Sequence, residues 1–222
     1  MCGRFTLTAT AKQVESLFDV VLQDALTARY NIAPTQPVLT VRLDGEGHRQ
    51  AEPMRWGLIP HWAKDASIGN RCLNARAETI HEKASFREPV RRRRCLIPAS
   101  GFFEWRREGK KRFPTYFHFV DNLGAFAGIW ETWKNGDTWV RSCAIITTTP
   151  NDLVAPLHDR MPVVLDPSQF GAWLDPNTRF SEVQPWLVPC ESELFEAWEV
   201  DPRVNLATNE GADLIEPLNT DV

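Results

Sequence analysis

AFAGIW (125–130) and TWVRSCAIITTT (138–149) are two runs rich in β-branched and aromatic residues, and the turn signal Asn135-Gly136-Asp137 stands between them. Such runs favour strands, and Asn-Gly between two strand-like runs is typical of a tight hairpin turn. This part of the chain is therefore predicted to form two strands separated by a turn.

The same pattern continues on both sides of this segment. VLTVRL (38–43) and TYFHFV (115–120) are further strand-like runs, and Asp44-Gly45 and Asp121-Asn122 are further turn signals. The strands do not alternate regularly with helices, which argues against a doubly wound sheet. We predict a single α+β domain built around a curved, barrel-like and mainly antiparallel sheet. The domain is expected to span residues 2–218, with 219–222 as a tail.

Short helices are expected at the margins of this sheet. Residues 11–22 carry apolar side chains at helical spacing, and Thr10 with Gln13 offers a capping box at the start. Shorter helical pieces are expected near 79–84, 151–157 and 167–174.

Composition and charge narrow the function classes. The chain has 222 residues, of which 43% are hydrophobic and 24% charged, as in globular proteins. The net charge of −4 does not by itself indicate a nucleic-acid-binding protein. Residues 87–112, however, contain ten basic and three acidic side chains. This segment could form a basic face, whereas the run Arg91–Arg94 could also be a simple solvated surface.

The sequence was also searched for targeting signals, cysteine patterns and cofactor-binding motifs. Residues 1–10 do not resemble a signal peptide, and no apolar run is long enough to span a bilayer. The five cysteines are scattered without a C-x-x-C pair, which argues against a disulfide framework and a zinc site and favours a reducing cytoplasm. The chain has no P-loop, Rossmann, H-E-x-x-H or G-x-S-x-G motif, which argues against a nucleotide-driven motor and a serine hydrolase. No metal or cofactor is expected.

Cys2 is the first residue that could carry chemistry. If Met1 is removed, Cys2 has a free α-amine and a thiol on adjacent carbons. The amine can add to an aldehyde to give an imine, and the thiol can then close a five-membered thiazolidine ring. Both groups titrate near pH 8, so both are partly available as nucleophiles. The alternative is that Cys2 is an incidental small residue.

Glu104 and His158 are candidates for proton transfer. Glu104 lies in GFFEW (101–105), where burial would raise its pKa into a useful range, although regular alternation would turn it toward water. His158 lies in LHDRMP (157–162) and suits acid–base work near neutral pH, or it is a structural histidine.

Several polar residues could hold a substrate. Asn74 in LNARAET (73–79) offers an amide, and Arg76 would share its face in an extended segment. Arg4 and Arg160 are further candidates for phosphate contacts.

Six segments taken together resemble the SOS response-associated peptidase family in matching order. The resemblance covers nearly the whole chain, from Cys2 to about Pro217, and its final element would be VNLATNEGADLIEPL (204–218). The six matching segments are MCGRF (1–5), RYNIAPTQ (29–36), RWGLIPHW (55–62), LNARAET (73–79), RCLIPASGFFEW (94–105) and LHDRMPVVL (157–165).

The resemblance implies four catalytic residues. Cys2, freed of Met1, would form a thiazolidine with the ring-opened sugar of an abasic site. Asn74 would position the α-amine and the sugar, and Glu104 would shuttle protons during imine formation and ring closure. His158 would protonate sugar oxygens and promote ring opening, or the reverse reaction.

The resemblance also implies DNA contacts. Arg4, Arg76 and Arg160 match positions expected to grip phosphates around the lesion. Thr147 in IITTT matches less firmly, because three threonines in a row leave its register open.

Three further positions would shape the path of the DNA. Trp62 and Trp105 match positions expected to line the DNA channel, and Pro34 would sit where the DNA bends and one flank of the duplex is excluded. An abasic site has no base to read, so the sequence preference should be weak.

The leading hypothesis is therefore a sensor that crosslinks covalently to abasic sites in single-stranded DNA and shields them during the damage response. An imine at the sugar C1′ would also acidify the C2′ proton and allow lyase chemistry. The alternatives are a thiol peptidase, including self-removal of Met1, and a non-covalent module for modified DNA. We expect a cytoplasmic monomer that joins the nucleoid during damage, with replication-fork proteins as candidate partners and no membrane contact.

Overall fold

The structure is a computed structural model that describes residues 2–218, apart from the side chains of Arg107 and Asn135. Five strands close into a barrel in the order β10-β4-β3-β6-β9, with β9 pairing back to β10. The pairing of β10 with β4 is parallel, and the other four are antiparallel. The barrel strands are β3 (Pro37–Leu43), β4 (Arg49–Trp56), β6 (Arg94–Ala99), β9 (Gly124–Asn135) and β10 (Thr138–Thr148).

The hairpin β9–β10 is the longest pairing of the barrel and confirms the prediction from residues 125–149. Its register runs from Asn135 opposite Thr138 to Gly128 opposite Ile145. Gly136 has a φ of 58° in the turn, a conformation that glycine adopts without steric cost. The long β9–β10 pair connects the two ends of the sheet, so this hairpin closes the barrel.

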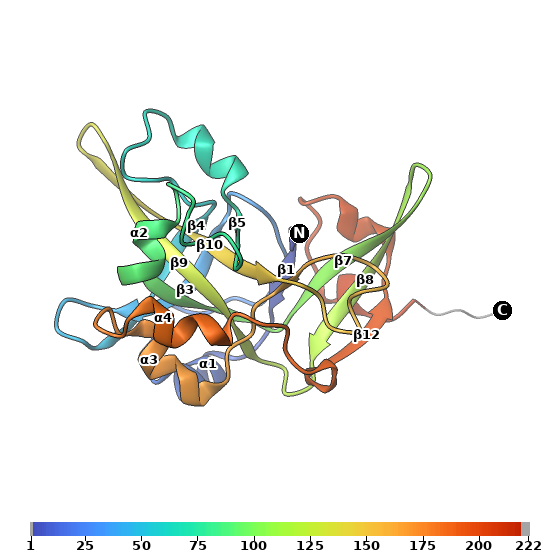
Figure 1. The fold of residues 1–222 in the computed structure, drawn as a ribbon. Coiled ribbons are helices and arrows are strands. Elements are labelled where there is room, and N and C mark those ends of the chain that lie inside the picture. The colour runs from blue at the N-terminus through green and yellow to red at the C-terminus, as the bar shows by residue number, and fades with distance from the viewer. Residues whose placement is uncertain (1, 219–222) are drawn as a thin grey trace.

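A second sheet lies beside the barrel, on the right of Figure 1, and continues the same domain. Its strand order is β12-β8-β7-β1-β2, and every pairing in it is antiparallel. Its strands are β1 (Phe5–Leu7), β2 (Arg29–Ile32), β7 (Gly101–Glu108), β8 (Lys111–Phe119) and β12 (Phe195–Glu199). The predicted single α+β domain with a curved, mainly antiparallel sheet is confirmed. The expected tail 219–222 lies outside the described residues.

The helices are short and peripheral, as expected, but the first is shorter than predicted. The helix α1 (Ala11–Phe18) begins with the predicted capping box between Thr10 and Gln13. It ends at Phe18 instead of continuing to residue 22, because Asp19 takes a left-handed conformation with φ of 53°. Two β-branched residues follow at once and favour an extended chain.

Of the other three segments expected to be helical, one forms helices and two do not. Residues 167–174 form a 3₁₀ turn (Pro167–Gln169) and α3 (Phe170–Leu174). Residues 79–84 and 152–157 form only turns, and in the second segment Pro156 lacks the N–H that a helix interior needs. The remaining helices are α2 (Arg87–Arg92) and α4 (Phe180–Val183).

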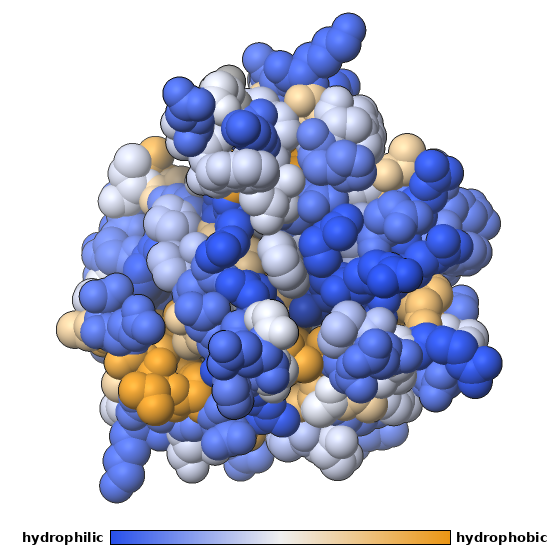
Figure 2. Space-filling model, turned by 90° about the vertical axis from the view of Figure 1, so that its left-hand side faces the viewer, coloured by the Kyte–Doolittle hydropathy of each residue, from blue (hydrophilic) through white to orange (hydrophobic). Residues whose placement is uncertain are grey.

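The basic run Arg91–Arg94 begins at the end of α2 and continues into β6, and it has exposed and buried members. Arg91 and Arg92 are exposed, and the side of the molecule that carries α2 presents mostly hydrophilic residues with an apolar area near its lower margin (Figure 2). Arg94 is buried instead, with 2% of its surface exposed. It donates hydrogen bonds to the backbone carbonyls of Val90, Arg91, Trp173, Asp175 and Thr178. Arg94 therefore ties the helices to the barrel wall.

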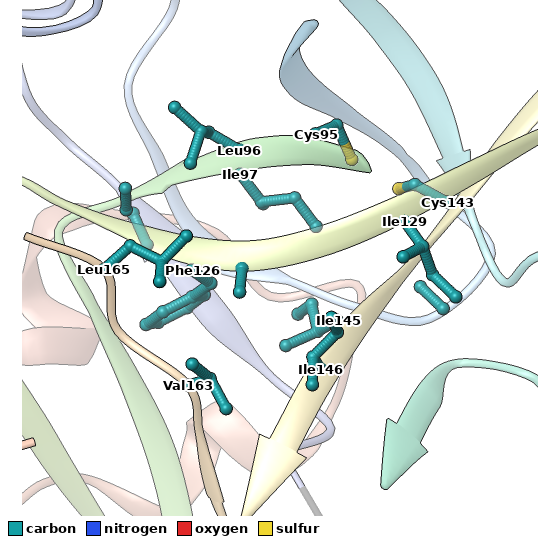
Figure 3. Packing of buried hydrophobic residues seen from close by; sticks show 14 of the residues in the cluster. Cys95, Leu96, Ile97, Phe126, Ile129, Cys143, Ile145, Ile146, Val163 and Leu165 are labelled. Atoms are coloured by element: carbon teal, nitrogen blue, oxygen red, sulfur yellow. The ribbon is translucent and has the colours of Figure 1, made fainter. Parts of the chain in front are cut away.

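Apolar side chains from the barrel strands fill the core (Figure 3). Phe126, Ile129, Ile145 and Ile146 are fully buried there. Gly128 lets the strands approach closely, because a Cβ atom at this position would lie 2.9 Å from the Cys95 Sγ. Among the described residues no helix is long and apolar enough to cross a membrane.

Candidate active site

Cys2 lies at the start of the chain beside strand β7. The backbone N–H of Phe103 donates to the carbonyl of Arg4 at 3.0 Å, which extends the β1–β7 pairing toward the N-terminus. Cys2 is fully buried, and its Sγ lies 3.8 Å from the Arg4 carbonyl oxygen. Burial, and then the nearby Glu104 carboxylate, raise the pKa of the Cys2 thiol far above its usual value. The thiol is therefore protonated at neutral pH.

Asn74 contacts Cys2 directly. It lies on the short strand β5 (Asn74–Arg76), which pairs in parallel with β10, and its Nδ2 donates to the Cys2 carbonyl at 2.8 Å. Its Oδ1 is buried and has no hydrogen-bond partner among the described residues. Asn74 thus fixes the backbone of Cys2 with one end of its amide and keeps a buried acceptor at the other.

Glu104 is buried, with only 3% of its surface exposed, so the sequence-based alternative that it faces water is wrong. Both Phe103 and Glu104 are buried because β7 is an inner strand of its sheet and both of its faces are covered. The pKa of Glu104 is raised to about 7, mainly by burial and to a smaller extent by the nearby Asp159 carboxylate. Near neutral pH this carboxyl group is therefore present in both protonation states.

His158 lies on the loop that follows the turns at 152–157. The backbone N–H of Arg160 donates to His158 Nδ1 at 2.9 Å, and Asp159 Oδ1 lies 3.0 Å from the same nitrogen. A nitrogen that accepts the backbone N–H cannot also donate to the carboxylate. We therefore place the proton of the neutral ring on Nε2.

This loop is held next to the other candidates. Arg160 makes two hydrogen bonds with the Glu78 carboxylate, at 2.8 and 2.9 Å, and a third with the Thr147 carbonyl. Thr147 pairs with Arg76, two residues beyond Asn74. The effect of Asp159 on the Glu104 pKa places the loop near Glu104 as well. The structure thus joins Asn74 to Cys2, places Glu104 beside Cys2 and holds the loop of His158 near them, while the catalytic roles stay predictions.

Arg4 and Trp105 form one wall beside Cys2. The Arg4 Nη1 donates to Asn31 Oδ1 at 2.6 Å and to the Val204 carbonyl at 2.8 Å, and its guanidinium lies 6.0 Å from the centre of the Trp105 ring. The Trp105 indole N–H donates to Asn205 Oδ1. The C-terminal segment 204–209 therefore braces two of the predicted DNA contacts.

The remaining predicted DNA contacts lie in different settings. Arg76 is exposed at the end of β5, and Trp62 exposes half of its surface on the loop after β4. Pro34 lies in a turn whose next residue, Thr35, has a φ of 72°. Thr147 is buried, and Arg160 is buried and bound to Glu78. Of these five residues, Arg160 donates to the Thr147 carbonyl, and Arg76 pairs with Thr147 across β5 and β10.

Asn31 and Asp159 are site residues that sequence reasoning did not name. Asn31 is fully buried, and besides accepting from Arg4 it donates to the carbonyls of Val204, Leu206 and Asn209. Its signal was a polar residue in an otherwise strand-like segment, RYNI, where a buried amide needs several partners. Asp159 gave no signal of its own, because its effect on Glu104 depends on the fold.

The comparisons with known proteins agree with the motifs. A family model described as SOS response associated peptidase matches residues 1–207. The Abasic site processing protein YoqW of Bacillus subtilis is 42% identical over 223 residues, covering 97% of this chain and 99% of the relative. The Escherichia coli protein YedK, also named an abasic site processing protein, is 29% identical and covers 98% of this chain and 100% of its own length.

A solved structure shares the fold. A crystal structure of a Bacteroides thetaiotaomicron protein superposes with a TM-score of 0.87 at 27% identity, and covers 97% of this chain and 99% of that chain. The resemblance read from six short segments is confirmed, and the chain belongs to the SOS response-associated peptidase family.

Proposed function

We propose that this protein processes abasic sites in DNA by capturing the sugar aldehyde in a thiazolidine ring at Cys2. The relatives named abasic site processing proteins support the substrate. The observation that carries the chemistry is the hydrogen bond from Asn74 to the Cys2 carbonyl, with the buried carboxyl of Glu104 close enough to perturb the thiol. A 1,2-aminothiol would stand there beside a group able to move protons.

The reaction begins with removal of Met1, which frees the α-amine of Cys2. The amine adds to the C1′ aldehyde of the ring-opened sugar, and the adduct loses one water to give an imine. The thiol sulfur then bonds to the imine carbon, and the thiol proton passes to the imine nitrogen. The product is the sum of protein and DNA minus one water.

Glu104 suits the proton transfers in this sequence. Formation of the imine needs an acid to help the hydroxyl leave as water, and ring closure needs a base to take the thiol proton. A carboxyl group with a pKa of about 7 can serve as both near neutral pH. The raised pKa of the Cys2 thiol makes such a base necessary, because the free thiolate is scarce.

Asn74 and His158 would handle the sugar. The buried Oδ1 of Asn74 is an acceptor without a partner among the described residues, and it would receive a hydrogen bond from the α-amine or a sugar hydroxyl. With its ring proton on Nε2, His158 would donate to the ring oxygen of the closed sugar and promote opening.

The DNA would run past residues that neutralise phosphates and stack. Arg4 and the exposed Arg76 would contact phosphates around the lesion, and Trp62 and Trp105 would offer aromatic surfaces. Arg160 would contact only a phosphate that comes close to it, because its guanidinium is held in place by Glu78. Thr147 would offer its hydroxyl, which has no partner among residues 2–218. Pro34 would border the point where one strand leaves.

The thiol-peptidase alternative is the weaker proposal. A thiol acts as a nucleophile through its thiolate, and burial at this site raises the pKa of Cys2 instead of lowering it. Imine formation begins with the amine, so it does not depend on an ionised thiol. Lyase chemistry remains compatible, since Glu104 could remove the acidified C2′ proton of the imine.

A crosslinking assay tests the proposal. Protein whose mass shows loss of Met1 is incubated with single-stranded DNA that carries an abasic site and then separated under denaturing conditions. We expect a shifted band for the wild type, and no such band for Cys2→Ala or for DNA with a reduced abasic analogue that lacks the aldehyde. Cys190→Ala, which removes a partly buried thiol elsewhere, is the matched control and should crosslink normally. An undiminished band from Cys2→Ala would refute the mechanism.

A further inference from the structure

A groove of about 1250 Å³ lies away from the candidate active site. One wall is formed by α1 and by residues 164–170, which lead into α3. Both helices lie at the lower edge of the molecule in Figure 1. The other wall is formed by the turn between β8 and β9 together with residues 185–194. None of the predicted catalytic or DNA-contacting residues lines it. The groove is therefore available for a task other than the chemistry at Cys2.

The floor of the groove is apolar. Leu17, Phe119, Leu165 and Phe170 line it, and Phe170 stacks on Phe18 at 5.4 Å between ring centres. At the lip, apolar side chains remain open to solvent: Leu194 is 41% exposed, Val120 50% and Val188 54%. An apolar groove with exposed aliphatic side chains at its lip is typical of a surface that receives another apolar group.

The wall formed by residues 185–194 is fixed in place. Thr148 donates to the Leu187 carbonyl at 3.2 Å, Asn151 donates to the Cys190 carbonyl at 3.1 Å, and the Val120 N–H donates to the Leu194 carbonyl at 3.1 Å. Pro185 and Pro189 further restrict the backbone. The groove is thus preformed, and a ligand would not have to order this wall on binding.

The groove is lined mainly by negatively charged side chains, which favour a positively charged ligand. Asp121, Asp166, Glu191 and Glu193 line it, whereas Lys12 is the single cation among its described lining residues. Hydrogen bonds from Ser168 lower the pKa of Asp166, so this carboxylate stays ionised at neutral pH. Four carboxylates would repel a DNA backbone and attract lysine and arginine.

From the apolar floor and the acidic rim together, we propose that this groove binds a basic, amphipathic peptide segment of a partner protein. The apolar side chains of the segment fill the groove, and its lysines or arginines face the carboxylates of the rim. An amphipathic helix laid into an apolar groove is a recurring mode of peptide recognition. Such a partner would bring the protein to its place of action without covering the proposed DNA site.

The test uses a fluorescent synthetic peptide of about three helical turns, with leucines along one face and lysines on the other. We expect its anisotropy to rise on addition of the full chain and the binding to weaken with salt. Glu191→Lys/Glu193→Lys should weaken binding about tenfold or more, because like charges then face each other. Val188→Asp should also weaken it. Glu46→Lys/Asp137→Lys, which makes the same charge change at two exposed hairpin turns outside the groove, should bind as the wild type does.

Three outcomes would overturn the proposal: no binding of the basic peptide, equal binding of a peptide with glutamate in place of lysine, or equal binding by the Glu191→Lys/Glu193→Lys variant. A dimer in sedimentation that Val188→Asp dissociates would also overturn it, since the groove would then hold a second copy. Crosslinking to abasic DNA should be unchanged in the groove variants, so this result does not depend on the proposed chemistry. Circular dichroism checks that each variant is folded.

Discussion

The barrel wall around Arg94 and the pocket around Glu104 both bury a charged side chain, but they treat that charge in opposite ways. Arg94 donates to five backbone carbonyls, and each of its nitrogens has a partner. Glu104 is held where burial and the Asp159 carboxylate both disfavour its charged form. A buried charge with a full set of partners is costly to disrupt, whereas one held at a perturbed pKa is suited to proton transfer.

Unpartnered polar atoms follow the same division. In the part of the chain that the structure describes, Arg4 Nε, Asn74 Oδ1, Thr147 Oγ1 and Arg160 Nε are buried without a hydrogen-bond partner. All four belong to residues that the family motifs point to, and Arg93 Nε is a comparable atom outside this group. Burying such groups without a partner costs free energy, which supports the proposal that these residues contact the DNA.

The largest effect is expected for Glu104→Gln, which removes the ionisable group and keeps the shape. Crosslinking should slow by about 10²–10⁴-fold, the usual contribution of a general acid or base, and the rate should lose its dependence on pH near 7. Single-turnover crosslinking between pH 5 and 9 measures both. An unchanged rate and pH profile would show that another group moves the protons.

The same variant should be more stable than the wild type above neutral pH. The Glu104 pKa rises from 4.5 to about 7 on folding, so the folded state holds its proton more tightly than the unfolded state does. The stability of the wild type should therefore fall as pH rises from about 4.5 through 7, by on the order of 3 kcal/mol from this group. Urea unfolding at pH 5 and pH 8 measures the difference, and Glu104→Gln should remove most of it.

Arg94→Met tests the other side of the comparison. It leaves several buried carbonyls without their donor, and we expect a loss of about 3–5 kcal/mol in the free energy of unfolding. Crosslinking per folded molecule should be unchanged. The matched control is the exposed Arg91→Met, which should change stability by about 0.5 kcal/mol or less. Equal losses of stability in the two variants would mean that the buried hydrogen bonds of Arg94 do not stabilise the barrel wall.

Arg94 also shows where sequence reasoning reached its limit. The strand runs and the Asn-Gly turn predicted the β9–β10 hairpin because their signals are local. The fate of Arg91–Arg94 depended on which carbonyls the folded chain places around each side chain, and the motif letters could not show this. The predicted helix at 11–22 also ended early, at Phe18, because Asp19 takes a left-handed conformation. The apolar spacing of the sequence did not show this.

The sequence named candidate members of the site but not their geometry. Ordered motifs pointed to Cys2, Asn74, Glu104 and His158, although these residues lie far apart in the sequence. The contact between Asn74 and Cys2 arises only because β5 pairs with β10, a parallel pairing without a local signal. Asn31 was missed because its importance lies in joining Arg4 to the C-terminal segment across more than 170 residues.

The smallest effect is expected for Thr147→Val, which tests whether the Thr147 hydroxyl contributes to stability or to DNA binding. Thr147→Val replaces the buried hydroxyl, which lacks a partner among the described residues, by a methyl group of similar size. Removing an unpaired buried polar group should leave the fold as stable as before or raise its stability by about 1 kcal/mol. If the hydroxyl serves the DNA, affinity for abasic single-stranded DNA should fall in the same variant. Thermal unfolding and DNA titration measure the two quantities, with the exposed Thr138→Val as control. Lower stability with unchanged affinity would show that Thr147, like Arg94, supports the barrel wall and does not contact the DNA.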